Sequence, residues 1–292
     1  MRSGTKARRF LSRHWSRFTR RAWLAAALWL AGVVVVAACQ KPPSDLAGDG
    51  SFVRLPACSG RQFETCPGQQ ISAAWYGEET TLYPHGVLGD AIEYSRLEVY
   101  TSAEHATACG TKSVRLGKQH VFEDLAPRLV DLDGDGTAEI ITIRSHVDKG
   151  AQIAIYGGGG DDAQLKLIAA TPYIGRRNRW LAPVGAADLD RDGYVEIAYV
   201  DRPHLAKTLR VWRFRDGKLE PVADQPGLTN HRIGQDFITS GIRDCGQGPE
   251  MITVDAGWDR VMVSRLQGGQ IRTTALGPFE GRASVDQALT CS

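Results

Sequence analysis

Short hydrophobic stretches of about five residues recur in the second half of the chain and are separated by polar turns. Residues 139–143 read Glu-Ile-Ile-Thr-Ile and residues 196–200 read Glu-Ile-Ala-Tyr-Val, a composition typical of strands. Two more hydrophobic strands follow each stretch, over 151–156 and 165–169 in the first case and over 209–214 and 219–223 in the second. The pattern therefore predicts repeated sets of short strands.

Two weaker sets extend the repeat in both directions. A later set is visible over 250–254 and 260–263, and an earlier one over 86–88, 95–100 and 113–116. Sets of about four strands every 50 to 60 residues are the signature of a β-propeller, with one set per blade. We expect an all-β fold and a small propeller of four blades, or five if residues 52–76 contribute strands. Ring closure is expected to pair N- and C-terminal strands within one blade.

An acidic loop precedes the first strand of the two clear sets. Residues 131–139 read DLDGDGTAE, and residues 188–196 read DLDRDGYVE 57 positions later. Each copy has acidic residues at positions 1, 3, 5 and 9 and Gly at position 6. This spacing lets several oxygens converge on a hard cation, with a backbone carbonyl at position 7. The sequence predicts two Ca²⁺ sites, with ligands Asp131, Asp133, Asp135, Thr137 and Glu139 in one and Asp188, Asp190, Asp192, Tyr194 and Glu196 in the other.

The main alternative for these loops is an EF-hand. An EF-hand loop ends with Glu at position 12, but that position holds Thr142 in the first copy and Tyr199 in the second. The residues after each loop also favour a strand over a helix. We therefore predict a strand-loop-strand cation loop, in which Gly136 and Gly193 make the sharp turn.

The loop followed by hydrophobic strands resembles the FG-GAP/VCBS repeat, the blade unit of integrin α-type propellers. The resemblance covers about residues 126–214 and continues more weakly to about 281. It implies Ca²⁺ binding between two strands of a blade through the acidic residues named above. The ninth position is Glu where many members have Asp. A third loop, 243–250, keeps one Asp and the final Glu, and we expect no ion there.

The N-terminus has the pattern of an export signal. Residues 1–38 carry eight of the 35 Lys and Arg residues and no acidic residue, and an uncharged apolar run extends from Ala22 to Ala38. The run ends at Cys39, in a context that resembles a bacterial lipobox, so Cys39 is the predicted lipidation site. Arg20-Arg21 also resembles a twin-arginine signal. The alternatives are an ordinary basic segment and an uncleaved apolar anchor.

Removing this segment changes the charge of the protein. The remainder keeps 27 basic and 33 acidic residues, a formal charge of −6, which gives no support to a nucleic-acid partner. We expect a signal peptide over 1–38, a Pro/Gly-containing tether over 39–51 and a propeller over 52–292, with the clearest repeats at 126–175, 183–225 and 237–281. A monomer is expected, exported to the periplasm or cell surface and anchored in the membrane.

Five cysteines remain after lipidation, which predicts two disulfides in an oxidising compartment. Cys58 and Cys66 form one candidate pair, and Cys245 and Cys291 form another. Spacing alone does not fix the connectivity, and Cys109 is the fifth cysteine.

The sequence favours a binding or scaffolding module over an enzyme. Motifs for serine hydrolases, zinc proteases and P-loops are missing from the sequence. The alternatives are a propeller hydrolase or lyase acting on an envelope polysaccharide, and a structural accessory of an envelope complex. An unknown protein or glycan is the expected ligand, and the residues of the candidate ligand face are His146, Lys149, His204, Lys207, Arg179 and Trp180.

Overall fold

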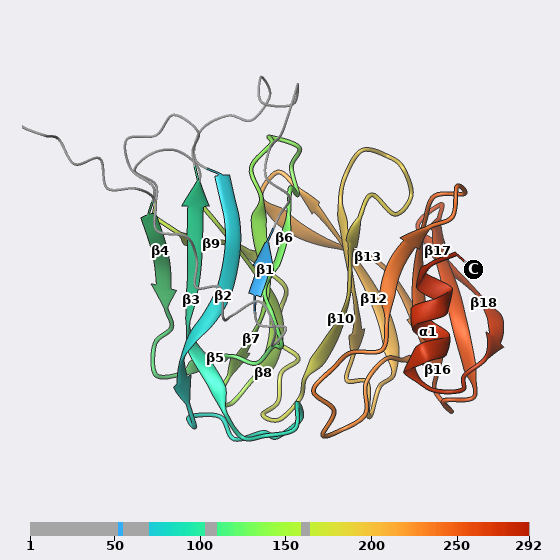
Figure 1. Ribbon diagram of the computed structural model, residues 1–292, viewed down its shortest axis with the longest axis horizontal. Helices are drawn as coiled ribbons and strands as arrows, with labels where there is room; N and C mark the ends of the chain where they lie inside the picture. The colour runs from blue at the N-terminus through green and yellow to red at the C-terminus, as the bar shows by residue number, and fades with distance from the viewer. Residues whose placement is uncertain (1–51, 55–69, 103–109, 159–163, 292) are drawn as a thin grey trace, which may run out of the picture. The chain divides into compact units, whose positions relative to one another are not determined.

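The computed structural model describes residues 52–54, 70–102, 110–158 and 164–291, which all belong to one compact unit within Ala37–Ser292. Figure 1 shows that this unit is built from strands, with one described helix, α1 (Arg282–Leu289). In these ranges no helix has the length and apolar character that a membrane crossing needs. The predicted signal peptide, Cys39, the tether, and Cys58, Cys66 and Cys109 lie outside the described residues.

The strands form four antiparallel sets of four, here called blades one to four. Blade one contains β1 (Phe52–Arg54), β2 (Gln70–Thr80), β3 (Glu93–Ser102) and β4 (Gly110–Arg115). Blade two contains β6 (Arg128–Val130), β7 (Glu139–His146), β8 (Gly150–Gly157) and β9 (Lys166–Ala170). Blade three contains β10 (Leu181–Ala187), β11 (Glu196–Asp201), β12 (Thr208–Arg215) and β13 (Lys218–Pro226). Blade four contains β15 (Gly241–Asp244), β16 (Pro249–Asp255), β17 (Arg260–Gln267) and β18 (Gln270–Pro278).

Two short strands supplement the blades. β5 (His120–Phe122) pairs with β3 and with β7, so it joins blades one and two into one sheet. β14 (Leu228–Thr229) pairs with β16. The all-β, propeller-type fold predicted from the repeat is confirmed. The described strands near the N-terminus belong to blade one, so they add no fifth blade.

The strand predicted over 86–88 is wrong. These residues lie in the connection between β2 and β3. Gly86 and Gly89 have φ values of +69° and +110°, a left-handed conformation that bends the chain. The strand that precedes β3 in blade one is instead β2.

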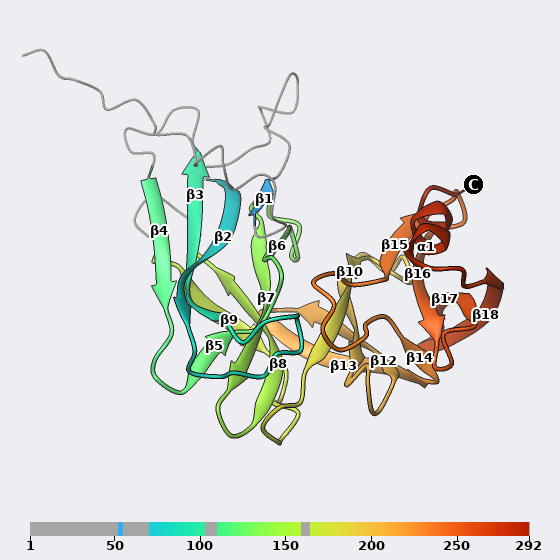
Figure 2. The ribbon, with the colours of Figure 1, turned by 60° about the horizontal axis from the view of Figure 1, so that its bottom comes forward.

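Burial follows the position of each strand in its blade. β7 and β8 are buried along nearly their whole length, because both of their faces pack against other blades, whereas the outer strands β13 and β18 alternate with exposed residues. Hydrophobic clusters fill the spaces between successive blades, as the side-by-side sheets of Figure 2 suggest. Ile143, Ile153 and Tyr199, for example, share the cluster between blades two and three.

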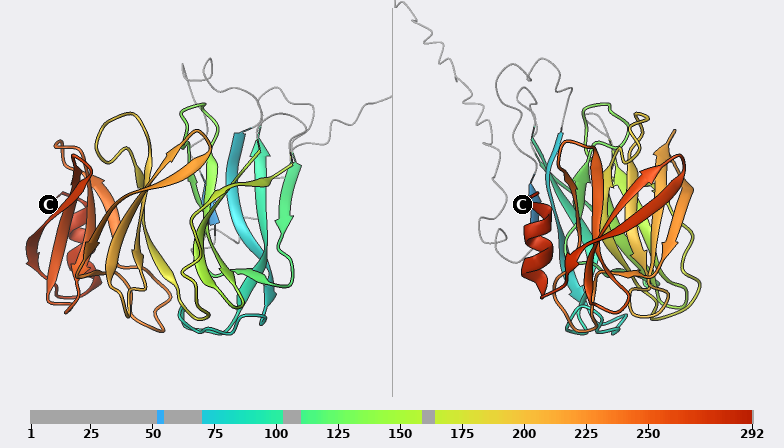
Figure 3. Two further views of the ribbon diagram at one scale, coloured as in Figure 1. Left: turned by 180° about the vertical axis from the view of Figure 1, so that it is seen from behind. Right: turned by 90° about the vertical axis from the view of Figure 1, so that its right-hand side faces the viewer.

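The far side of blade four is covered by α1. Val285 and Ala288 of this helix are buried with Ile252, Val254 and Val263 of the blade, and Figure 3 shows the helix lying against those strands. Among the described strands β18 pairs only with β17 and none joins blade one to blade four, so the predicted ring closure is wrong there. A helix that buries the last apolar face replaces it, as capping elements do in repeat proteins.

Blade one carries a cluster of charged side chains on β2, β3 and β4. Glu78 forms ion pairs with Arg96 (3.0 Å) and with Arg115, and Arg96 also lies near Glu98.

The pairing of Cys245 with Cys291 is confirmed, with a Cα–Cα distance of 5.6 Å. Cys245 lies in the β15–β16 loop and Cys291 follows α1, so the disulfide fastens the helix to blade four. Arg243 adds a hydrogen bond of 2.5 Å to the carbonyl of Ala288.

Because the two cysteines are 46 positions apart in the sequence, the disulfide restricts a long loop of the unfolded chain. We expect the Cys245→Ser/Cys291→Ser double variant to lose about 2–4 kcal/mol of unfolding free energy. Urea denaturation of the variant and of the unmodified protein measures this loss. Equal midpoints would contradict a stabilising role for the clamp.

Candidate functional site

The first acidic loop connects β6 to β7 and is folded by the carboxylate of Asp131. This carboxylate accepts hydrogen bonds from the backbone N–H groups of Gly134 (2.8 Å) and Gly136 (3.0 Å). Both glycines have positive φ, +75° and +85°, where a side chain would be strained. The sharp turn predicted at Gly136, the sixth position of the loop, is therefore present.

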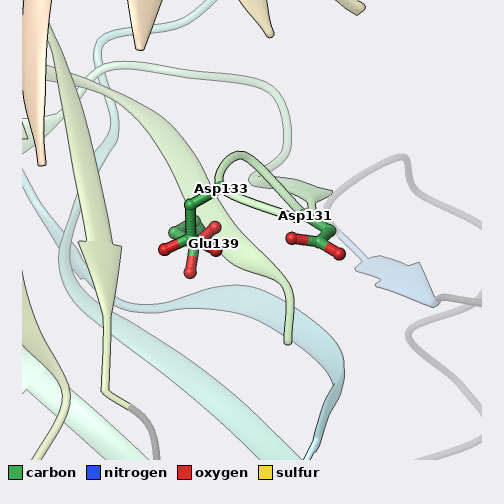
Figure 4. Close-up of side chains that lie close together, drawn as sticks. All are labelled: Asp131, Asp133 and Glu139. Atoms are coloured by element: carbon green, nitrogen blue, oxygen red, sulfur yellow. The ribbon is translucent and has the colours of Figure 1, made fainter. Parts of the chain in front are cut away.

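Three of the predicted side-chain ligands of this loop gather together. Asp131, Asp133 and Glu139 each offer an oxygen that lies within 4.8 Å of the others (Figure 4). Asp135 does not join this group, and its carboxylate accepts the N–H of Thr137 at 2.7 Å. The backbone carbonyl of Thr137 stays a predicted ligand.

Glu139 is the buried member of the group, with 6% of its surface exposed. Its Oε2 accepts the N–H of Leu132 at 2.9 Å. Burial, followed by the nearby carboxylates of Asp133, Asp135 and Asp131, raises the pKa of Glu139 to about 7. Among the described residues no Lys or Arg forms an ion pair with these four acids. The first loop therefore concentrates negative charge around a buried carboxylate without a protein cation.

The second acidic loop connects β10 to β11 with the same backbone plan. The carboxylate of Asp188 accepts the N–H groups of Asp192 and Gly193, both at 3.0 Å, and Glu196 accepts the N–H of Leu189 at 2.8 Å. Gly193 again has positive φ, +91°. A second group of oxygens within 4.8 Å comes from Asp188, Asp190 and Glu196. The carbonyl of Tyr194 stays a predicted ligand.

The electrostatic surroundings of the second loop differ from those of the first. Arg213 on β12 places Nε 2.5 Å from Glu196, Nη2 2.6 Å from Asp190 and Nη1 2.7 Å from Asp192. Burial raises the pKa of Glu196, and the hydrogen bond from Arg213 opposes that shift. One guanidinium thus contacts three of the four acids of this loop.

The third loop, between β15 and β16, contains a buried glutamate with two arginines. Glu250 pairs with Arg243 through an N–O distance of 2.8 Å, and also with Arg265. Asp244 accepts two backbone N–H groups of the loop. Among the described residues, no third acidic side chain lies close to both Glu250 and Asp244.

The proposed ligand-face residues occupy equivalent connections but are only partly accessible. His146 and Lys149 lie at the β7–β8 turn, and His204 and Lys207 lie in the β11–β12 connection, as the repeat predicted. His146 is buried against His120, however, so it cannot contact a ligand directly. Lys149 is exposed.

The basic-aromatic stretch also contributes little surface. Trp180 is buried, and its indole N–H donates to the carbonyl of Glu123 at 2.8 Å. The prediction of Trp180 as a surface residue is therefore wrong, because its ring fills the space between blades. Arg179, which is half-buried, donates to the carbonyl of Asn178 at 2.9 Å.

A cluster of buried acids between blades one and two was not indicated by the sequence. Asp124 accepts hydrogen bonds from Tyr76 (2.9 Å) and Arg128 (2.8 Å), while Glu123 contacts His85 and Ser145. The motif Phe122-Glu123-Asp124-Leu125 was the available signal, since two acids there interrupt an apolar stretch.

Glu93 is the third buried acid of this region. Burial, followed by the charges of Glu123, Asp90 and Asp124, raises the pKa of Glu93 to about 10. It is therefore a neutral carboxylic acid near pH 7.

A histidine pair lies between blades three and four. The Nε2 of His231 donates to the carbonyl of Gln235 at 2.9 Å, which leaves Nδ1 of His231 to accept from Nε2 of His204 at 3.0 Å. Burial, followed by the neighbouring His231, lowers the pKa of His204 to about 4. Both rings are therefore neutral near pH 7.

The raised pKa of Glu93 predicts a pH dependence. The folded protein keeps a proton that the unfolded chain releases near pH 4.5, so this contribution to stability is complete below about pH 4.5 and is lost as pH rises through about 10. We expect Glu93→Gln to be more stable than the unmodified protein at alkaline pH. Urea midpoints at about pH 5, 7 and 9 test this.

Glu98→Gln on the same strand is the matched control, because Glu98 is part-exposed beside Arg96. A Glu93→Gln variant whose midpoints follow those of the unmodified protein at every pH would refute the assignment of the buried proton.

Comparison with known proteins finds a similarity to a repeat family over part of the chain. Residues 131–199 match the FG-GAP-like repeat. No curated protein matches the chain. Among solved structures, Saccharomyces cerevisiae Sqt1 is similar with 10% identity and a TM-score of 0.35, and the exotype rhamnogalacturonan lyase YesX with 16% identity and a TM-score of 0.32. Each alignment covers 72% of this chain and 50% of the other, so the chain spans half the length of either structure.

The match to the repeat begins at the first residue of the first acidic loop and ends within β11, after the second loop. The match therefore contains both acidic loops, which lie in register in two of the four antiparallel blades of this propeller-type fold.

Proposed function

We propose that this chain is an exported, membrane-anchored propeller module that holds Ca²⁺ in its first acidic loop and binds or scaffolds a partner at the cell envelope. The proposal rests on the cluster of carboxylates in the first loop. This cluster forms no ion pair with a Lys or Arg among the described residues, and it lies in the segment that matches the FG-GAP-like repeat.

The residues of the first loop fit a hard cation. Asp131, Asp133 and Glu139 supply oxygens that already lie near one another, and Asp135 and the carbonyl of Thr137 complete the set named from the spacing. Ca²⁺ accepts six to eight oxygens in flexible geometry, whereas Mg²⁺ demands near-ideal octahedral geometry and releases its water reluctantly. An all-oxygen loop of carboxylates and carbonyls therefore favours Ca²⁺.

The role of the ion in this proposal is structural. The loop joins β6, which has only three residues, to β7, which is buried at the centre of blade two. A cation that neutralises Glu139 would fix this corner and stabilise the folded state by mass action. No catalytic step is required of it.

The opposite end of the blades is the better candidate for a partner. In an antiparallel blade the acidic loops join the first strand to the second, so the next connections emerge at the other end. Exposed aliphatic side chains lie at this end, namely Leu82 and Ile92 between β2 and β3, Leu205 between β11 and β12, and Ile233 between β14 and β15. The connections touch one another, because Gly234 donates its N–H to the carbonyl of Val87 at 3.0 Å.

The character of these side chains favours a protein over a glycan. Sugar rings stack on aromatic faces, whereas the exposed large residues of this end are Leu and Ile, which suit an apolar protein surface. Lys149 adds a positive charge to this end. The buried acids between blades one and two give no support to an enzyme, since Glu93, Glu123 and Asp124 are at most 2% exposed and could not touch a substrate.

Thermal unfolding of the purified protein tests the Ca²⁺ proposal. At free Ca²⁺ of about 10 to 100 times Kd, binding adds about 1.4–2.7 kcal/mol to the unfolding free energy. We expect Tm to rise by about 3–10 °C relative to the protein in chelator. Asp133→Asn should lose most of this rise, because it removes a ligand without changing the size of the side chain.

In chelator the same variant should unfold at an equal or higher temperature than the unmodified protein, because it relieves repulsion among the four acids of the loop. Asp216→Asn, in the exposed β12–β13 turn, is the control and should keep the full rise. If Tm is the same in Ca²⁺ and in chelator for the unmodified protein and for both variants, the Ca²⁺ proposal is rejected.

The anchor is tested separately at Cys39. We expect the protein to incorporate labelled fatty acid, to stay with the membrane after alkaline washing, and to have a mature mass that begins at Cys39. Cys39→Ser should abolish the labelling. Membrane retention of an unlabelled, full-length Cys39→Ser chain would show instead that the apolar segment itself is an uncleaved anchor.

A further inference from the structure

We propose that Arg213 takes the place of the cation in the second acidic loop, so that the two loops are alike in sequence but different in ion occupancy. That the first loop binds an ion is part of the function proposed above, and this inference rests on it. The second loop is neutralised by a guanidinium that belongs to the protein.

The contacts of Arg213 are those expected of a substitute for an ion. Its three nitrogens each meet a different carboxylate, from Glu196 (2.5 Å), Asp190 (2.6 Å) and Asp192 (2.7 Å). The Glu196 side chain is fully buried, and those of Arg213 and Asp190 are 16% exposed. Charge-assisted bonds of this length, largely shielded from water, are among the strongest polar contacts of a protein.

The same register position differs from blade to blade. In blade three Arg213 pairs directly with Glu196 across β11 and β12. In blade two the pairing of Ile140 with Tyr156, continued by one residue, sets Gly157 opposite Glu139. In blade four Arg265 contacts Glu250 from the corresponding place. The residue that faces the buried glutamate is thus Gly, Arg and Arg in successive blades.

The first loop has no equivalent arginine, because the position opposite Glu139 is Gly157. A Cβ on Gly157 would lie 3.6 Å from Cγ of Glu139, so this position does face the glutamate. It would also lie 2.3 Å from Cδ1 of Ile168, whose side chain fills the space. An apolar side chain cannot neutralise Glu139, and the first loop is left dependent on a cation from solution.

A divalent ion in the second loop would have to displace Arg213. The guanidinium engages oxygens of Asp190 and Glu196, two of the three acids that lie close enough to share an ion. A cation bound beside Arg213 would also meet a like charge. The ligands themselves are retained, and Oδ1 of Asp190 is buried without a hydrogen-bond partner. The second loop is therefore a latent site that Arg213 blocks.

Ca²⁺ titration of the full chain, purified in detergent and followed by calorimetry, tests this. We expect one tightly bound Ca²⁺ for the unmodified protein and two for Arg213→Met, which keeps the aliphatic volume and removes the charge. Arg265→Met is the matched control. It removes the corresponding arginine of blade four, where the third loop lacks the other acids, and should still bind one ion.

A second pair of variants keeps the test decisive if Arg213→Met does not fold. Asp190→Asn should leave the single ion in place, whereas Asp133→Asn should lose it. Two ions in the unmodified protein, or loss of the ion in Asp190→Asn, would overturn the assignment of Arg213. So would a folded Arg213→Met that gains no ion.

Failure of the proposed function gives a different result. If the unmodified protein binds no Ca²⁺ while Arg213→Met binds one, the first-loop ion is rejected and the blocking role of Arg213 stands. If neither binds Ca²⁺, both statements are rejected.

Discussion

A buried glutamate at the start of the second strand constrains blades two, three and four alike. Glu139, Glu196 and Glu250 are 6%, 0% and 1% exposed, and each begins or lies near the start of a strand that is buried on both faces. A carboxylate in such a place is costly unless it is hydrogen-bonded and matched by positive charge. The loops, the arginines of the third strands and the proposed ion are different ways of meeting this one requirement.

The acidic loops could be predicted from sequence because their information is local. Nine consecutive residues contain the ligands, the turn glycine and the start of the strand, and the structure closes each turn around the first Asp as the spacing required. Arg213 was missed because it lies 17 residues after Glu196 and faces it only through the register of β11 and β12. Aligning the repeats one strand further, to Gly157 and Arg265, would have shown the difference.

The two errors in the fold have different physical origins, and the first lies at the end of the array of blades. A hydrophobic face on the last blade must be covered, and from the repeat we predicted that pairing of N- and C-terminal strands would cover it. The structure uses α1 instead, whose Val285 and Ala288 are two small apolar residues in an eight-residue segment too short to have a strong helical pattern. Residues 86–88 were read as a strand from Val87 and Leu88, but the flanking glycines bend the chain there.

The group that neutralises the buried glutamate differs from blade to blade. The blades therefore differ in how far their stability depends on a cation from solution. Blade four holds Glu250 with two arginines and is closed by a disulfide, and blade three holds Glu196 with Arg213. Blade two alone leaves its glutamate without a protein cation among the described residues. Its first strand, β6, has three residues and is fixed otherwise by the Arg128–Asp124 pair. Of these three blades, blade two is therefore the one whose β6–β7 corner depends on a cation from solution, whereas blade four is held by its own arginines and its disulfide.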